Sequence, residues 1–124
     1  MTDYLIIGLG GFLGANARYL VGGWAAKMYG STFPYGTFLI NVTGSFFIGF
    51  VLTLITDRFS APPSTRLFFI VGFTGAYTTF STYMFESISL IQQRAYLAAI
   101  VYALGSVVVG LVAVTAGVIA GRAV

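Results

Sequence analysis

The sequence predicts an all-α integral membrane protein with four transmembrane helices, and its composition, charge distribution and length each support this class. Of the 124 residues, 58% are hydrophobic and 7% are charged, so the chain lacks the polar surface that a soluble domain of this size requires. Residues 4–17, 28–56, 67–85 and 95–121 contain no Asp, Glu, Lys or Arg. Because a span needs roughly 20 apolar residues to cross about 30 Å of hydrocarbon, four spans use most of the chain and leave a single membrane domain, residues 1–124.

The first span is expected over residues 4–26, with Arg18 inside it. The N-terminus has no basic region and no small-residue cleavage pattern, so this segment is expected to be a span and not a signal peptide. Its glycines at positions 8, 10 and 14 miss the spacing of a dinucleotide-binding turn by one residue, and the next acid after Asp3 is Asp57. A glycine-rich membrane helix is therefore the better interpretation.

The remaining spans are separated by short polar segments. The turn-forming sequence GSTFP precedes the second span, which is expected over residues 35–56. The clearest loop is DRFSAPPSTR, residues 57–66, because charged residues and prolines interrupt the apolar pattern there. The third span, residues 67–91, is joined to the fourth, residues 96–121, by QQR at positions 92–94.

The basic residues are divided almost evenly between the two sides of the membrane. Arg58, Arg66 and Arg122 fall on one side, and Lys27 and Arg94 fall on the other. Because the Lys/Arg bias of short loops sets orientation, so small a bias predicts insertion in both orientations and an antiparallel dimer. The charges form no basic cluster of the kind that binds nucleic acid. Without Cys or His, thiolate chemistry and the commonest general base are absent, so the chain is expected not to be an enzyme.

Pairs of small residues four positions apart recur in the predicted spans. They are Gly10 and Gly14, Ser45 and Gly49, Ser106 and Gly110, and Gly117 and Gly121. Helices associate in lipid through close packing and interhelical hydrogen bonds, so small residues at this spacing mark contact faces. The pairs predict a tight bundle that includes a partner subunit.

Arg18, Asn41 and Glu86 are the candidate functional groups within the predicted spans, because an ionisable or strongly polar side chain there usually faces a cavity or a pathway. Arg18 would either reach the interface or place a positive charge in an aqueous vestibule that attracts anions. Asn41 would form an interhelical hydrogen bond or bind a ligand. Glu86 follows Phe80 and Tyr83 at intervals of three, so the three side chains share a face where the segment is helical.

Within the segment GAYTTFSTYMFE, residues 75–86, the third span is predicted to break over residues 75–82. Gly and Thr are poor helix formers, and irregular backbone at membrane depth is tolerated only where it is buried in protein or lines a polar cavity. Freed carbonyls would form a cation site, and a half-helix N-terminus would attract anions. The edges of the Phe80 and Tyr83 rings carry positive potential. In the alternative, the hydroxyls bond back to the preceding turn and the Phe packs against lipid.

Three stretches resemble the Fluc (CrcB) family of fluoride channels, and the resemblance covers essentially the whole chain. They are GFLGANARY at 11–19, PYGTFLINVTG at 34–44 and, most specifically, GFTGAYTTFSTYMFE at 72–86. The resemblance implies a dual-topology antiparallel homodimer in the bacterial inner (plasma) membrane, with two pores that export fluoride passively. It also implies a structural Na⁺ at the dimer interface, held by the backbone carbonyls of Gly75 and Thr78.

The resemblance further implies which side chains line the fluoride pathway. The matching positions are Thr37, Asn41, Phe80, Ser81, Thr82, Tyr83, Glu86, Tyr102 and Ser106. Arg18 matches a first-span arginine that resembles a vestibule or structural charge. The chain departs from the family pattern at two positions. Tyr83 replaces the second of two phenylalanines, and its hydroxyl would donate to fluoride or block the contact with the ring edge; Gly110 stands where a hydroxyl is usual.

Other functions are compatible with four short spans. A small dual-topology multidrug exporter would need a carboxylate in the first span, which contains Arg18 and no acid beyond Asp3. A proton-coupled fluoride transporter would use Glu86. A purely structural subunit of a larger complex would leave the polar residues within the spans unexplained.

Overall fold

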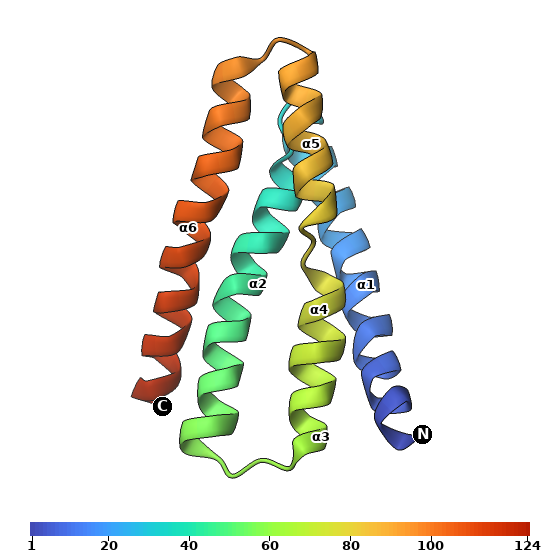
Figure 1. Cartoon of the computed structure of the whole chain (residues 1–124), viewed down its shortest axis with the longest axis vertical. Coiled ribbons are helices and arrows are strands. Elements are labelled where there is room, and N and C mark those ends of the chain that lie inside the picture. Colours follow the sequence, from blue (N-terminus) through green and yellow to red (C-terminus); the bar gives the residue numbers. More distant parts are fainter.

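The computed structural model describes all residues 1–124 and is entirely helical (Figure 1). The elements in chain order are α1 (Thr2–Tyr29), α2 (Tyr35–Thr53), the π-helical turn η1 (Leu54–Arg58), α3 (Pro63–Arg66), the π-helical segment η2 (Leu67–Thr74), α4 (Gly75–Tyr77), α5 (Ser81–Gln92) and α6 (Tyr96–Ala123). Elements α3, η2 and α4 follow one another without interruption and form one helix. The predicted all-helical class is therefore confirmed.

Three helical segments are long and apolar enough to cross a membrane, namely Thr2–Tyr29, Tyr35–Arg58 and Tyr96–Ala123. The third predicted span is not among them, because a break after α4 divides it. Helix α5 has 12 residues, fewer than the roughly 20 that a span needs. Figure 1 shows the two halves following one another along the bundle, so that together they match the length of the other helices.

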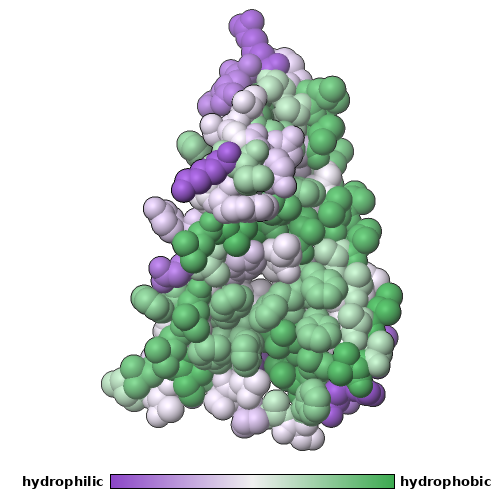
Figure 2. All heavy atoms as spheres, turned by 180° about the vertical axis from the view of Figure 1, so that it is seen from behind, coloured by the Kyte–Doolittle hydropathy of each residue, from purple (hydrophilic) through white to green (hydrophobic).

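The two ends of the bundle carry different connections. Both termini and the loop at residues 59–62 lie at one end, and the loops at residues 30–34 and 93–95 lie at the other (Figure 1). Figure 2 shows apolar atoms across the middle of one face, with most of the strongly hydrophilic atoms toward the two ends. Only 17 of the 124 residues are buried within the chain, so lipid or another protein must cover most of its apolar surface.

Glycines bring α1 against the first half of the broken segment. A Cβ atom at Gly14 would overlap the carbonyl oxygen of Phe73, and one at Gly72 would lie 2.6 Å from the carbonyl oxygen of Ile7. The backbones of α1 and η2 therefore touch, and no side chain larger than hydrogen fits between them.

The same kind of contact joins α2 to α6. A Cβ atom at Gly49 would overlap the carbonyl oxygen of Val114, and one at Gly117 would overlap that of Phe46. Gly14, Gly49 and Gly117 of the predicted pairs thus mark close helix contacts within one chain, whereas Gly110 has only an ordinary van der Waals neighbour. Contact with a partner subunit stays a prediction.

We expect Gly14→Ala to lower the free energy of unfolding by about 1–3 kcal/mol, because the added methyl group meets backbone that cannot move aside. Gly8→Ala in the same helix is the matched control, since a Cβ atom at Gly8 has no neighbour within 4 Å. Reversible unfolding of the purified protein by SDS measures both. Equal effects of the two substitutions would contradict the close contact.

Candidate functional site

The site is built around the break between α4 and α5. Gly75 has helical torsion angles, φ −61° and ψ −36°. Thr78 leaves the helix with an extended backbone, φ −82° and ψ 159°, and Phe80 returns to helical values, φ −89° and ψ −40°. The break therefore covers residues 78–80. The small and hydroxylated residues predict a longer break, over residues 75–82. The observed break is narrower because Gly75 continues the helix.

The side chain of Asn41 satisfies the backbone in the break. Its Nδ2–H donates to the carbonyl oxygen of Thr79 over 2.9 Å, and the Thr79 N–H donates to Asn41 Oδ1, also over 2.9 Å. An unpaired backbone group at membrane depth costs several kcal/mol, so this two-way pairing permits the break. The amide has two N–H donors, and the second is left available for a ligand.

The break frees the two carbonyls that the family resemblance assigns to a cation. In a continuous helix the Gly75 carbonyl would accept from the Thr79 N–H, and the Thr78 carbonyl from the Thr82 N–H. Here the Thr79 N–H donates to Asn41 Oδ1, and the Thr82 N–H donates to Thr79 Oγ1 over 3.3 Å. Carbonyl oxygens are the kind of ligand that hard cations take, so the freed pair fits a cation such as Na⁺.

The hydroxyl groups near the break have different partners. Thr78 Oγ1 donates to the carbonyl oxygen of Thr74 over 2.8 Å, so it bonds back to the preceding turn. Thr79 Oγ1 accepts from the first turn of α5. Ser81 and Thr82, in contrast, are exposed and their hydroxyls form no hydrogen bond within the chain. The bond-back alternative therefore describes Thr78 only.

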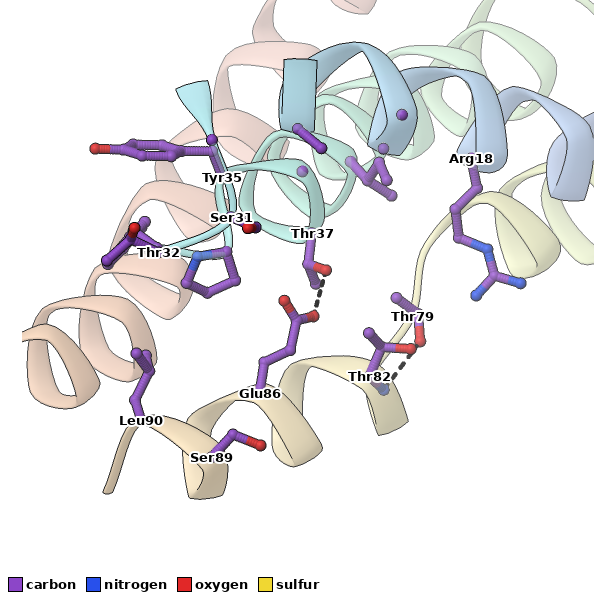
Figure 3. A pocket seen from close by; sticks show the side chains of 18 of the residues that line it. Arg18, Ser31, Thr32, Tyr35, Thr37, Thr79, Thr82, Glu86, Ser89 and Leu90 are labelled. Atoms are coloured by element: carbon purple, nitrogen blue, oxygen red, sulfur yellow. Dashed lines mark hydrogen bonds between the residues drawn. The ribbon is translucent and has the colours of Figure 1, made fainter. Parts of the chain in front are cut away.

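A cavity of about 750 Å³ lies beside the break, toward the end of the bundle that carries the loop at residues 30–34. Figure 3 shows Arg18 from α1 extending toward Thr79 and Thr82, and Thr37 from α2 facing Glu86 of α5. Arg18 is the one basic side chain among the residues that line the cavity, and Glu86 is the one acidic side chain. Of the two expectations for Arg18, the vestibule charge agrees with this position.

Thr37 and Glu86 join α2 to α5 at the wall of the cavity. The Thr37 hydroxyl donates to Glu86 Oε1 over 2.5 Å (Figure 3). Thr37 is buried and Glu86 is half-buried. Because a charge-assisted hydrogen bond is short and strong, this contact fixes the carboxylate at one position in the wall.

Tyr83 is held between α5 and α6. Its side chain is 8% exposed, and its hydroxyl donates to the carbonyl oxygen of Ala103. Its ring meets Phe80 edge to face at 6.0 Å between ring centroids, and it meets Tyr102 in the same way at 5.3 Å. In this arrangement the hydroxyl is occupied by α6, and the ring takes part in the aromatic contacts that a phenylalanine would make.

Two further hydroxyl groups are buried on α6 without a partner. Tyr102 is 0% exposed, and neither its hydroxyl nor Ser106 Oγ forms a hydrogen bond. Buried polar groups are normally paired, and one left unpaired is costly in a dry interior. These two atoms therefore mark a place where a hydrogen-bonding guest would be stabilised.

The predicted site residues fall into two groups in a single chain. The cavity is lined by Arg18, Thr37, Thr82 and Glu86. Away from its lining lie Asn41, the buried side chains Tyr83 and Tyr102 and the half-buried Ser106, together with Phe80, which is 72% exposed, and the exposed Ser81.

The sequence does not identify two hydrogen-bonding groups of the site, because both belong to the backbone. These are the peptide of Thr79, which pairs with Asn41, and the carbonyl of Ala103, which accepts from Tyr83. The sequence carries no signal for the Ala103 carbonyl, since any residue at that position would offer it. Thr79 lies in the predicted break, where a freed peptide requires a partner.

A broken membrane helix that carries unpaired carbonyls beside a polar cavity is typical of small ion channels and transporters. The chain matches the family described as CrcB-like protein, Camphor Resistance (CrcB), over residues 5–118. It therefore belongs to the CrcB family, and the resemblance seen in the sequence is confirmed.

Relatives with known names cover almost the full length of the chain. A protein of Chloroflexus aurantiacus named fluoride-specific ion channel FluC is 48% identical over 98% of this chain and 97% of its own length. Proteins of the same name from Acidobacterium capsulatum and Rhizobium meliloti are 45% and 42% identical. The alignments cover 96% and 99% of this chain, and 95% and 98% of those proteins, respectively.

We expect Asn41→Ala to lower the free energy of unfolding by about 1–3 kcal/mol, because it removes two interhelical hydrogen bonds and leaves the Thr79 peptide unpaired. Asn16→Ala is the matched control, since the exposed Asn16 amide bonds only to Phe12 in its own helix, over 2.7 Å. Unfolding in SDS gives both values. A loss for Asn41→Ala no larger than for Asn16→Ala would show that the pairing does not hold the break.

Proposed function

We propose that the chain is a passive fluoride-selective channel that exports cytoplasmic fluoride and has no enzymatic activity. Relatives named fluoride-specific ion channel align with nearly its whole length, which supports fluoride as the ion. The structural observation that carries the proposal is the helix break, whose Thr79 peptide pairs with Asn41. This break lies beside a cavity in which Arg18 is the one basic side chain. The unbonded hydroxyls of Ser81 and Thr82 beside the break offer hydrogen-bond donors without a strong countercharge, which suits a small anion that must bind and leave.

The proposed mechanism needs no coupled energy source. Hydrogen fluoride crosses a membrane as a neutral molecule and dissociates in a less acidic cytoplasm, and the trapped anion then leaves through the pore down its gradient. This role places the protein in the inner membrane of a bacterium. A larger halide would fit the donors too poorly to recover its hydration energy, so the pore would exclude chloride.

In the proposed pathway each group has a separate role. Arg18 raises the local concentration of anions in the cavity, as a positive charge in a confined space does. Hydroxyls of Ser81, Thr82, Tyr102 and Ser106 and the second N–H of Asn41 supply donors, whereas the single Thr37 proton is donated to Glu86. The ring edges of Phe80 and Tyr83 present positive potential. Glu86 stays in the wall through its hydrogen bond to Thr37.

We propose that two chains assemble as an antiparallel homodimer with one pore per subunit. Phe80 is 72% exposed in the single chain, and Gly75 is exposed beside it, so the break lies on a surface that a second copy would cover. The Gly75 and Thr78 carbonyls of both subunits would hold a structural Na⁺ there. When bound, that ion supplies a positive charge between the two pores.

The direct test is fluoride release from liposomes that contain the purified protein, with chloride-loaded liposomes as the control. We expect rapid fluoride release and no chloride release. No fluoride release, or equal release of both anions, would overturn the proposal.

Fluoride–proton exchange, in which Glu86 would carry the proton, is a second candidate because Glu86 is the one acidic residue that lines the cavity. Stoichiometric proton movement in the same assay would favour it.

We expect Phe80→Ile to reduce fluoride release at least about 100-fold without unfolding the dimer, because an aliphatic side chain lacks the positive ring edge. Phe85→Ile is the matched control, since Phe85 is 70% exposed on α5, the helix that follows Phe80, and it neither lines the cavity nor contacts the Phe80 and Tyr83 rings. Flux assays and size-exclusion profiles of both variants make the comparison. Unchanged release by Phe80→Ile would remove Phe80 from the pathway.

We expect Tyr83→Phe to keep fluoride release within about twofold and to lower the free energy of unfolding by about 0.5–1.5 kcal/mol, because the hydroxyl bonds to Ala103 of α6. The same two assays measure both properties. A large loss of flux at unchanged stability would instead assign the hydroxyl to the ion. A gain in flux would show that it obstructs the pore.

A further inference from the structure

Helices α2 and α6 carry polar residues at matching intervals of four. Thr37, Asn41 and Ser45 follow at intervals of four on α2, and Tyr102, Ser106 and Gly110 do so on α6. Residues four apart lie on the same face of a helix, and both helices run from the same end of the bundle (Figure 1). The α2 row is complete, whereas the α6 row ends at a glycine.

The gap in the α6 row is filled from α2. A Cβ atom built at Gly110 would have Ser45 Oγ as a neighbour at 3.6 Å, which is an ordinary van der Waals distance. Ser45 therefore occupies the space that a side chain at position 110 would border. One helical turn above Gly110, Ser106 Oγ is buried and unpaired, and one turn further the Tyr102 hydroxyl is in the same condition.

The hydroxyl of Ser45 is free to change its partner. It now donates to the carbonyl oxygen of Asn41 over 2.6 Å. That carbonyl belongs to the interior of α2, where the Ser45 N–H is its regular helical partner. Turning the hydroxyl proton away therefore leaves no backbone group unpaired, and the rotation costs little.

The polar rows end at this position. One turn beyond Ser45 and Gly110, a Cβ atom at Gly49 would overlap the carbonyl oxygen of Val114. The backbones of α2 and α6 are in contact there, and no space remains between them for an ion. Ser45 is consequently the last hydroxyl along the two rows before the helices close on one another.

We infer that Ser45 is a further hydroxyl donor of the anion pathway and that it replaces the side chain missing at Gly110. The inference rests on the proposed function and deepens it, because it adds a residue of α2 to the unpaired hydroxyls of Tyr102 and Ser106. The ligand it would bind is the small anion that those two hydroxyls face. The donor at this end of the pathway would then come from α2 instead of α6.

The test exchanges the hydroxyl between the two helices in the full-length protein in liposomes. We expect Ser45→Ala to slow fluoride release about five- to tenfold, the effect of one lost hydrogen bond. Adding Gly110→Ser to that variant should restore release to within about twofold of the unaltered protein, because the neighbouring space accepts a Cβ atom at an ordinary distance. Adding Gly110→Ala instead should restore nothing, since it brings the same Cβ without the hydroxyl.

Three results would overturn the inference. These are release by Ser45→Ala at the unaltered rate, equal release by the two double variants, and recovery with Gly110→Ala. The two double variants differ by one oxygen atom, so a difference between them reports the hydroxyl and not the fold, and SDS unfolding of each confirms that it is folded. If the unaltered protein itself released no fluoride, the proposed function would fail instead, which separates the two conclusions.

Discussion

The pairing between the Asn41 side chain and the peptide of Thr79 is the interaction on which the rest of the site depends. A membrane interior offers no water to a freed peptide, so a break in a helix there must be satisfied by protein. Asn41 accepts from the N–H and donates to the C=O of the same residue, which a single amide can do without strain. Because the Thr79 N–H is engaged in this way, the carbonyl of Gly75 is released, and α5 begins as a separate helix.

Glycine contacts fix the distances between the other helices of the bundle. Gly14 lets α1 touch the backbone of the first half of the broken segment, and Gly49 and Gly117 let α2 touch α6. The second half, α5, is held by side chains instead. Thr37 bonds to Glu86, and Tyr83 bonds to Ala103. The first half of the broken segment is therefore held by close backbone packing, and α5 is held by a few hydrogen bonds around the cavity.

Much of this arrangement could be predicted from composition and pattern. Charge-free stretches predict the helices, and small residues at intervals of four predict their contacts. The break was predicted from Gly75 and the clustered threonines, but its limits were not, because Gly75 has helical torsion angles and the chain departs from the helix at Thr78. A weak helix former permits a break, and the presence of a partner decides where it falls.

The sequence by itself determined the class of protein, the four hydrophobic segments, the family and the set of polar residues within the membrane, because hydrophobicity and residue type are local properties. Only the tertiary structure decided what those residues contact. The sequence allows the Tyr83 hydroxyl either to donate to an ion or to obstruct it, and the structure binds that hydroxyl to the Ala103 carbonyl. The sequence predicts Ser45 to be a small packing residue, and the structure places it beside the gap at Gly110. Both outcomes depend on how α6 is placed against α2 and α5, which no single segment encodes.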